Sequence, residues 1–248
     1  MESFRVLGIP FYRGSLIEVC RKSRQGGLVL APSGPGMSSD LLLCNEYKKA
    51  LLHADINLLD SGLIALWCKL KRRKTIPRIS GLRFLRTYLL ETNWNREVSF
   101  WVMPTEAQSK ANLDWVKSKF SHQVYEESVY IAPNYPRTGK IEDPRLLSIL
   151  KSKNPDNVFI QIGGGVQERL GFYLKNNLPE RTTVICTGAA LAFLSGQQVK
   201  IPMWADRLFL GWFFRCLTKP RIFVPRYLKA FYLFYLLLRF DSNEPDLS

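Results

Sequence analysis

Histidine is scarce in this 248-residue sequence, and cysteine is never paired. The only histidines, His53 and His122, lie far apart in the chain. The five cysteines are odd in number and form no C-x-x-C pair, and neither H-E-x-x-H nor Asp-x-Asp occurs. We therefore expect no metal site, no cofactor and no cysteine–histidine catalysis. We interpret each cysteine as a core residue of a protein in a reduced, cytoplasmic compartment.

Long apolar segments are also missing. The longest apolar run, residues 230–238, has nine residues, about half of the roughly 20 that a membrane-spanning helix needs. Near the N-terminus, residues 6–11 are too short and too interrupted by proline to form the core of a signal peptide. The sequence thus predicts neither a spanning helix nor export.

Acidic residues are absent or rare in two segments that hold the excess of positive charge. The 35 Lys and Arg against 21 Asp and Glu give a net charge of +14. Residues 69–86 hold eight basic residues and no acid, and residues 200–240 hold eight against Asp206 alone. Charge concentrated in this way indicates nucleic acid, anionic lipid or a phosphorylated substrate as partner. Because no RNP, zinc or helix-turn-helix pattern accompanies it, we do not expect nucleic-acid binding.

The hydrophobic pattern is that of a globular α/β protein. Hydrophobic residues make up 46% of the chain, and short aliphatic runs alternate with segments of helical period. The predicted strands are residues 28–31, 56–59, 98–102, 124–131, 158–162 and 183–186. The predicted helices are residues 40–53 (with Ser39 or Asp40 as N-cap), 62–70, 82–90, 106–120, 144–151 and 166–176. We expect a Rossmann-like parallel sheet sandwiched by helices over residues 1–200.

Residues 201–248 differ in composition, because aromatic, leucine and basic residues dominate there. We predict a C-terminal helical appendage, broken into pieces by Pro220 and Pro225. Its last piece, residues 226–240, interleaves aromatic side chains with Lys229 and Arg239, which is typical of a helix that lies on an anionic membrane surface. A terminal helix that packs on the core is the alternative, and this segment alone favours neither.

Asp60 is the first candidate for chemistry. It follows an apolar strand and precedes Ser61-Gly62 and a helix, which places its carboxylate at the carboxyl ends of the strands, where ligands bind in open α/β sheets. A carboxylate there can act as a general base. On local pattern alone, an N-cap of the following helix is the commoner role for such a residue.

The glycine run Gly163-Gly164-Gly165 also connects a predicted strand to a helix. Bare backbone N–H groups at a helix start can face an anion, although the run matches a dinucleotide loop poorly because Glu168 takes the place of the third glycine. A plain strand–helix connector is the commoner interpretation. Gln167 and Glu168 are the side chains that could meet a sugar.

Three arginines in the C-terminal segment are spaced by prolines and aromatic residues. Arg215, Arg221 and Arg226 could form an anion clamp, since guanidinium groups bind phosphate bidentately. For each arginine singly, solvated surface charge is the alternative.

A set of short motifs runs through the chain in a fixed order. They are Ala54-Asp55, Asp60-Ser61-Gly62, Arg78-Ile79-Ser80-Gly81, Asn154-Pro155-Asp156, Gly163 to Glu168, Gly188 to Gly196, Pro202-Met203-Trp204, Trp212-x-x-Arg215, Lys219-Pro220-Arg221 and Arg226-Tyr227. No one of them is specific, but their order and spacing are. Over nearly its whole length the chain resembles the WecB/TagA/CpsF family of bacterial glycosyltransferases (glycosyltransferase family 26).

The resemblance implies a Rossmann-like domain with a C-terminal appendage and an inverting transfer. Because the sequence has no metal motif, we expect the transfer to be metal-independent, with arginines neutralising the departing diphosphate. The donor would be a UDP-sugar and the acceptor a sugar on a polyprenyl diphosphate, in cell-envelope or exopolysaccharide synthesis, with an N-acetylmannosamine-like sugar transferred. The protein would lie peripherally on the inner face of the cell membrane, and the sequence leaves a homo-oligomer open.

Residue by residue, the resemblance makes Asp60 the catalytic base and places Gln167 at the sugar site. It places arginines of the appendage near the UDP diphosphate. The expected substrate-binding residues are Ser33, Ser61, Gly81, Gly163, Gly164, Gly165, Glu168, Arg215, Arg221 and Arg226.

The chain also departs from the family pattern. Ala31-Pro32-Ser33 replaces the usual Thr-x-Asn, which removes a hydroxyl and an amide from the expected sugar pocket. Gly165 replaces the proline of the family's Gly-Pro-x-Gln-Glu pattern, Gly211 replaces a glutamate, and Met103-Pro104 replaces a pair of glycines. The donor sugar therefore stays open. A non-catalytic, membrane-associated member that binds a sugar nucleotide or a partner protein is the alternative.

Overall fold

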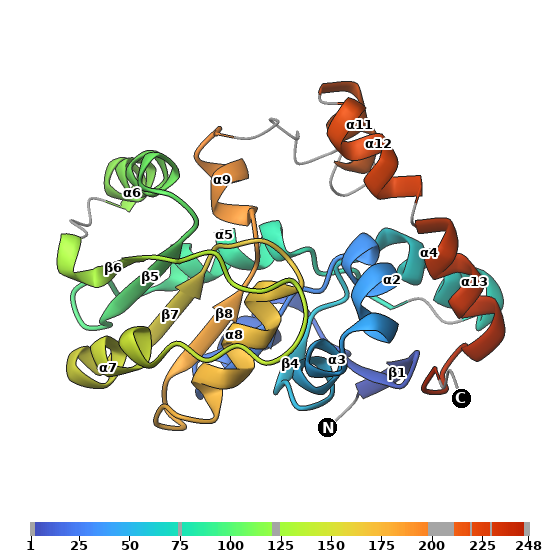
Figure 1. Ribbon diagram of the computed structural model, residues 1–248, viewed down its shortest axis with the longest axis horizontal. Helices are drawn as coiled ribbons and strands as arrows, with labels where there is room; N and C mark the ends of the chain where they lie inside the picture. The colour runs from blue at the N-terminus through green and yellow to red at the C-terminus, as the bar shows by residue number, and fades with distance from the viewer. Residues whose placement is uncertain are drawn as a thin grey trace.

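A six-stranded parallel sheet forms the centre of the molecule (Figure 1). The computed structural model describes residues 3–73, 76–120, 125–197, 211–218, 220–228 and 230–245. The strand order across the sheet is β4-β3-β8-β7-β5-β6. The strands are β3 (Gly27–Leu30), β4 (Ile56–Asn57), β5 (Ser99–Met103), β6 (Val129–Ile131), β7 (Asn157–Ile160) and β8 (Thr183–Cys186). A separate antiparallel hairpin, β1 (Ser3–Val6) and β2 (Ile9–Tyr12), precedes the sheet.

Helices cover both faces of this sheet. One core contains side chains of α1 (Leu16–Ser23), α5 (Gly81–Glu91), α6 (Glu106–Phe120) and α9 (Ala190–Leu194). The other contains side chains of α2 (Gly34–Leu43), α3 (Asn45–Leu52), α4 (Gly62–Lys71), α7 (Pro144–Lys153) and α8 (Val166–Lys175). In β3, Leu28 and Leu30 face one core and Val29 faces the other, as the two-residue period of a strand requires. The predicted Rossmann-like sandwich is confirmed.

The expected single helix at residues 40–53 is wrong. The structure has two helices there, with a break at Cys44, whose backbone is extended (φ −134°, ψ 98°). The N-cap of α2 is Ser33, whose hydroxyl accepts from the N–H of Gly36, and Pro35 occupies the first turn. These two residues start the helix earlier than Ser39 or Asp40, the predicted caps.

The strand expected at residues 124–131 is also shorter than predicted. β6 begins at Val129, directly after a 3₁₀ turn (Glu126–Ser128), and residues 121–124 lie outside the described part.

Three helices form the described end of the chain: α11 (Gly211–Thr218), α12 (Pro220–Leu228) and α13 (Ala230–Phe240). The expected boundary at Pro220 is confirmed, because α12 begins there and the first helical position needs no N–H. The expected break at Pro225 is wrong, since that residue lies inside α12. No helix within the described ranges is long and apolar enough to cross a membrane.

The last helix packs on the core with one face and exposes the other. Leu233, Leu236 and Leu237 are fully buried and belong to the same core as α2. Phe231 and Leu238, on the opposite face, are 73% and 58% exposed. The packing interpretation is therefore confirmed for the inner face of α13, and the membrane-surface interpretation stays a prediction for the exposed face.

The residues after α13 bind the N-terminal hairpin. The carboxylate of Asp241 accepts from the indole N–H of Trp67 and from Nε of Arg72, both at 2.8 Å. Its backbone carbonyl accepts from the N–H of Leu7, in the turn between β1 and β2. These contacts fix the end of α13 to the core.

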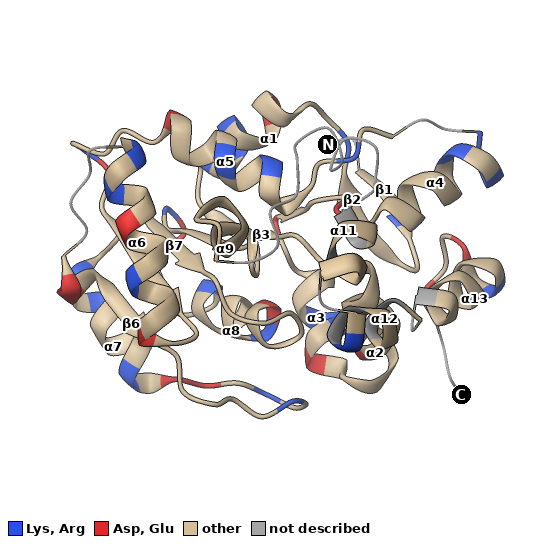
Figure 2. Ribbon diagram, turned by 90° about the horizontal axis from the view of Figure 1, so that it is seen from above, with Lys and Arg blue, Asp and Glu red and all other residues tan. Residues whose placement is uncertain are grey.

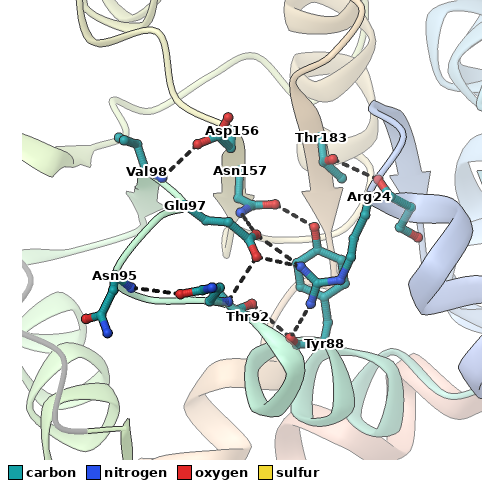
Figure 3. Close-up of polar contacts among 11 residues, drawn as sticks. Arg24, Tyr88, Thr92, Asn95, Glu97, Val98, Asp156, Asn157 and Thr183 are labelled. Carbon is teal, nitrogen blue, oxygen red and sulfur yellow. Dashed lines mark hydrogen bonds and ion pairs between the residues drawn. The ribbon is translucent and has the colours of Figure 1, made fainter.

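A network of polar side chains lies at the amino ends of the strands (Figure 3). The hydroxyl of Tyr88 donates to Oδ1 of Asn157 at 2.5 Å, and Nδ2 of Asn157 donates to Glu97 at 2.8 Å. Nη1 of Arg24 lies 2.8 and 3.0 Å from the two carboxylate oxygens of Glu97, and its guanidinium lies over the ring of Tyr88. The contacts pair these polar groups inside the protein. The network joins α5 and β7 at the edge opposite the candidate site, which we interpret as a structural role.

Candidate active site

The candidate site lies where four adjacent strands end. The loops after β4, β3, β8 and β7 share one edge of the sheet, because these strands are parallel neighbours. Direct contacts connect the loops. Gly81 lies so close to the loop after β3 that an added Cβ would be 2.9 Å from Cβ of Ala31, and it also borders Thr187 after β8. Nε2 of Gln161, after β7, donates to the hydroxyl of Thr187 at 3.0 Å.

Asp60 lies at this edge, two residues beyond Leu58. Its Oδ1 accepts from the backbone N–H of Gly81, the first residue of α5, at 3.1 Å. The helix N-terminus stabilises a negative charge at that position. The side chain is 28% exposed, so part of it is open to solvent. The arrangement combines an oriented carboxylate with access for a reacting hydroxyl.

The alternative role of Asp60, as N-cap of its own helix, is wrong. The N-cap of α4 is Ser61, whose hydroxyl accepts from the N–H of Ile64 at 3.4 Å. Asp60 instead contacts the start of α5, 21 positions further along the chain.

Arg78 is a site residue that the sequence analysis did not single out. Its Nε donates to the backbone carbonyl of Asp60 at 2.7 Å, and Nη2 lies 3.7 Å from Oδ1 of the same residue. The side chain is only 16% exposed, so the ion pair is partly shielded from water. The available signal was the Arg78-Ile79-Ser80-Gly81 motif, which was obscured by the basic run around it.

The two predicted serines cap helices. Ser33 caps α2, and Ser61 caps α4. An added Cβ on Gly34 would lie 2.9 Å from the hydroxyl oxygen of Ser61, so the two helix starts lie side by side. Because a hydroxyl that accepts one hydrogen bond can still donate another, capping is compatible with binding a ligand.

The glycine turn after β7 presents open backbone. Gly163 and Gly164 have no atom within 4 Å of an added Cβ, whereas Gly165, at φ +84°, lies against the carboxylate of Asp40. Gln167 and Glu168 follow in the first turn of α8, and both are buried. Burial raises the pKa of Glu168 to about 7, and the charge of Asp40 adds to the rise.

Of the three predicted clamp arginines, only Arg221 has a side chain within the described part of the structure. Arg221 is exposed at the start of α12. Arg215 lies in α11 and Arg226 in α12, but their side chains are outside the described part of the structure. Figure 1 shows α11 and α12 on the same side of the sheet as α9, which follows the carboxyl end of β8. The expected clamp stays a prediction.

Metal ligands do not gather in the part of the chain that the structure describes. In those residues, no three His, Cys, Asp or Glu side chains come together in a way that could hold an ion. Cys20, Cys44, Cys68 and Cys186 are buried and unpaired, as the sequence analysis expected of core cysteines.

Comparison with known proteins gives two matches. Residues 4–245 match the model of the glycosyl transferase WecG/TagA/CpsF family. A curated protein of Bacillus subtilis (strain 168), N-acetylglucosaminyldiphosphoundecaprenol N-acetyl-beta-D-mannosaminyltransferase, is 23% identical to the chain over 227 residues. The aligned region covers 89% of this chain and 85% of that protein.

Proposed function

Because the chain belongs to the WecG/TagA/CpsF family of glycosyl transferases, we propose that it moves an N-acetylmannosamine-like sugar from UDP to a sugar on a polyprenyl diphosphate. The printed name of the Bacillus subtilis relative, which pairs a mannosaminyl group with a diphosphoundecaprenol acceptor, supports this substrate class. The reaction would be inverting and metal-independent and would serve cell-envelope or exopolysaccharide synthesis. The observation that carries the proposal is the placement of Asp60 between the α5 N-terminus and Arg78.

Asp60 is the proposed general base. In one inverting displacement, the acceptor hydroxyl attacks the anomeric carbon from the side opposite the UDP, while a base on that side removes the hydroxyl proton. The N–H of Gly81 and the guanidinium of Arg78 hold Oδ1 of Asp60, while the side chain stays 28% exposed. The carbon–oxygen bond to UDP breaks as the new glycosidic bond forms.

The departing UDP needs positive charge. Cations aimed at the diphosphate stabilise negative charge as it develops on the leaving oxygen. Arg215, Arg221 and Arg226 are the proposed cations, because α11 and α12 lie on the site's side of the sheet and their sequence is rich in arginine. Ser33, Ser61, Gly81, Gly163, Gly164 and Gly165 are proposed to contact the donor, and Gln167 to contact its sugar.

A lipid-linked acceptor requires contact with a membrane surface. On α13, Phe231, Tyr235 and Leu238 are spaced by four and three residues and are 73%, 45% and 58% exposed, so they form one apolar outer face. This face suits insertion into the headgroup boundary of a bilayer. The proposed location is the inner face of the cell membrane.

The apolar surface continues from α13 onto α4. The ring of Phe234 meets Trp67 of α4 edge-on, with centroids 5.8 Å apart. On the outer side of α4, Leu66 and Leu70 are 51% and 69% exposed. Exposed lysines, Lys69 and Lys71, end that helix, where Figure 2 shows a cluster of basic residues. Apolar side chains beside cations match an anionic bilayer.

The second candidate function is binding without catalysis of sugar transfer. Ala31-Pro32-Ser33 replaces the family's Thr-x-Asn, and Ala31 is buried against Gly81 close to Asp60. This replacement favours a member that binds a sugar nucleotide or a partner protein without turnover.

One experiment separates the two candidates. Purified protein is incubated with a panel of UDP-sugars and a lipid-linked acceptor analogue, and UDP release and glycosylated lipid are measured with and without EDTA. Turnover that survives EDTA supports the transferase. UDP binding without release from any donor supports the non-catalytic candidate, and turnover that requires added Mg²⁺ or Mn²⁺ contradicts the metal-independent mechanism.

A further inference from the structure

Glu168 carries a carboxylate that is buried within the candidate site. Only 1% of the residue is exposed. Oε2 accepts from the backbone N–H of Gly165 at 2.7 Å, and Oε1 accepts from Nε2 of Gln167 at 3.2 Å. Both oxygens therefore already bind donors of the protein itself. For this reason we do not assign Glu168 a direct contact with the substrate.

The side-chain amide of Gln167 continues the connection to the next strand. Its Oε1 accepts from the backbone N–H of Gly188 at 2.7 Å, in the turn after β8. Because one end of the amide must accept from Gly188 and the other must donate to Glu168, only one orientation of the amide satisfies both, and the second hydrogen of Nε2 is the group left to contact the donor sugar. Gln167 and Glu168 thus join the glycine turn after β7 to the turn after β8, in adjacent parallel strands.

We propose that Glu168 is a positioning residue for the sugar end of the site, and that its ionised carboxylate holds the Gln167 amide and the glycine turn in the arrangement that the reaction needs. The inference rests on the proposed function, because it takes Gln167 to contact the donor sugar. Glu168 acts through Gln167 and Gly165 and touches neither substrate nor the reacting atoms.

Burial and the carboxylate of Asp40 disfavour the negative charge of Glu168. Asp40, on α2, lies against Gly165 with its carboxylate, and Tyr47, on α3, and Cys186, on β8, are buried close by. Burial and, to a smaller extent, the charge of Asp40 raise the pKa of Glu168 to about 7, and hydrogen bonds from its own backbone N–H, from Gln167 and from Gly165 limit the rise.

The neighbouring cation serves other contacts. Arg169 is 3% exposed and donates to backbone carbonyls of its own helix and of the loop before α7, at Gly165, Pro136, Arg137 and Gly139. It therefore fixes that loop rather than pairing with the carboxylate of Glu168.

Protonation changes what Glu168 can accept. An ionised carboxylate accepts at both oxygens, whereas a carboxylic acid carries a hydrogen on one of them. That hydrogen would face either the N–H of Gly165 or the amide N–H of Gln167, so one of the two hydrogen bonds is weakened. The glycine turn after β7 is then held less firmly to the Gln167 amide, which still accepts from Gly188 after β8, and the site should lose activity as pH falls below about 7.

The pH profile of kcat/KM tests this role in three variants. We expect the wild-type profile to fall on the acid side near pH 7, and Asp40→Asn to move that fall to lower pH because it removes a like charge. Glu168→Gln should lose the fall near pH 7, keeping only the fall at lower pH that an aspartate base such as Asp60 requires, and should be slower at pH 8 by on the order of 10-fold, the value of one hydrogen bond. The control Glu142→Gln, in an exposed ion pair with Lys140, should follow the wild type. A Glu168→Gln profile with the wild-type acid fall would overturn the proposal, as would an unmoved fall in Asp40→Asn.

A second measurement does not depend on turnover. Hydrogen exchange of residues 163–168 and 187–189 is compared between wild type and Glu168→Gln at pH 6 and pH 8, each pair at the same pH. We expect the wild-type turns to lose protection at pH 6 relative to pH 8, after correction for intrinsic rates, and the variant to show no such difference. This result with no turnover of any UDP-sugar would refute the proposed function and keep the role of Glu168. Equal pH responses in both proteins would overturn the role even if the enzyme is active.

Discussion

The carboxylate of Asp60 and the backbone N–H of Gly81 are joined by a hydrogen bond of 3.1 Å, although 21 positions separate the two residues. The bond places a partly exposed carboxylate on the N-terminus of α5, where a negative charge is stabilised. It also means that the residue proposed as the base does not cap the helix that follows it, since Ser61 does. A substitution of Asp60 can therefore change turnover without removing the N-cap of α4.

We predict that Asp60→Asn lowers turnover by about 10² to 10⁴ while UDP affinity and the thermal midpoint stay nearly unchanged. The asparagine oxygen can still accept from Gly81, but an amide cannot take the hydroxyl proton. Turnover, UDP binding and thermal midpoint are measured on one preparation.

The matched control is Ser15→Ala, which removes the capping hydroxyl of α1. It should lower the free energy of unfolding by about 1 kcal/mol and leave turnover per folded molecule unchanged. Near-normal turnover of Asp60→Asn would rule out Asp60 as the base.

Much of the sheet could be predicted because its signals are local. The strand at residues 183–186 and the helix at residues 106–120 have the predicted bounds, since each has an uninterrupted apolar or helical pattern. Asp60 could be identified because the end of a parallel strand is a position that the pattern itself marks.

Other features depend on contacts that no local pattern encodes. The β1–β2 hairpin turns at Leu7-Gly8, where both residues have a positive φ (52° and 74°). Gly8 suits such a turn, but a leucine at positive φ is unusual, so the sequence signal is weak. Helix α2 starts in a segment of glycine and proline, with Met37 and Leu41 buried beneath it. A glutamate such as Glu168 in the first turn of a helix is expected to be exposed. Only the tertiary fold shows that this side chain is buried.

For the arginine clamp, we predict that replacing whichever of Arg215, Arg221 and Arg226 contacts the diphosphate costs on the order of 10²-fold or more in kcat, since a preorganised charge is removed from the transition state. Each is changed to glutamine and assayed with EDTA present. Arg96→Gln removes the same charge at an exposed position near the amino ends of the strands and should retain wild-type turnover. Wild-type rates in all three clamp variants would contradict the assignment.

Membrane binding can be tested without removing α13. Deleting residues 226–248 would take the buried Leu233, Leu236 and Leu237 out of the core, so a truncated chain tests folding as much as binding. We predict instead that Phe231→Ser with Leu238→Ser reduces sedimentation with anionic vesicles and leaves the thermal midpoint within a few degrees, because both side chains are exposed. Leu90→Ser, at an equally exposed position on α5, is the control and should bind as the wild type does. Unchanged sedimentation of the double variant would exclude this face as the membrane contact.

The buried carboxylate of Glu168 should make stability depend on pH. Its pKa is raised from the ordinary 4.5 to about 7 by burial first and by Asp40 as well. A carboxyl group with a raised folded pKa contributes stability that is fully present below the unfolded pKa and is lost as pH rises through the folded pKa. We therefore predict that the free energy of unfolding, taken as wild type minus Glu168→Gln, falls by on the order of 3 kcal/mol between pH 4.5 and pH 8.

Urea unfolding of the wild type and Glu168→Gln from pH 4.5 to pH 8 measures this difference in free energy. Groups that titrate alike in the two proteins contribute equally to both and drop out of the difference. Glu142→Gln, whose carboxylate pairs with Lys140 at the surface, should give a difference that is flat to within about 0.5 kcal/mol. A flat difference for Glu168→Gln as well would show that the carboxylate is as easily ionised in the folded protein as in the unfolded chain. The predicted fall of the free-energy difference toward pH 8 would mean that the ionised form of Glu168, which accepts both hydrogen bonds, lowers the stability of the folded protein.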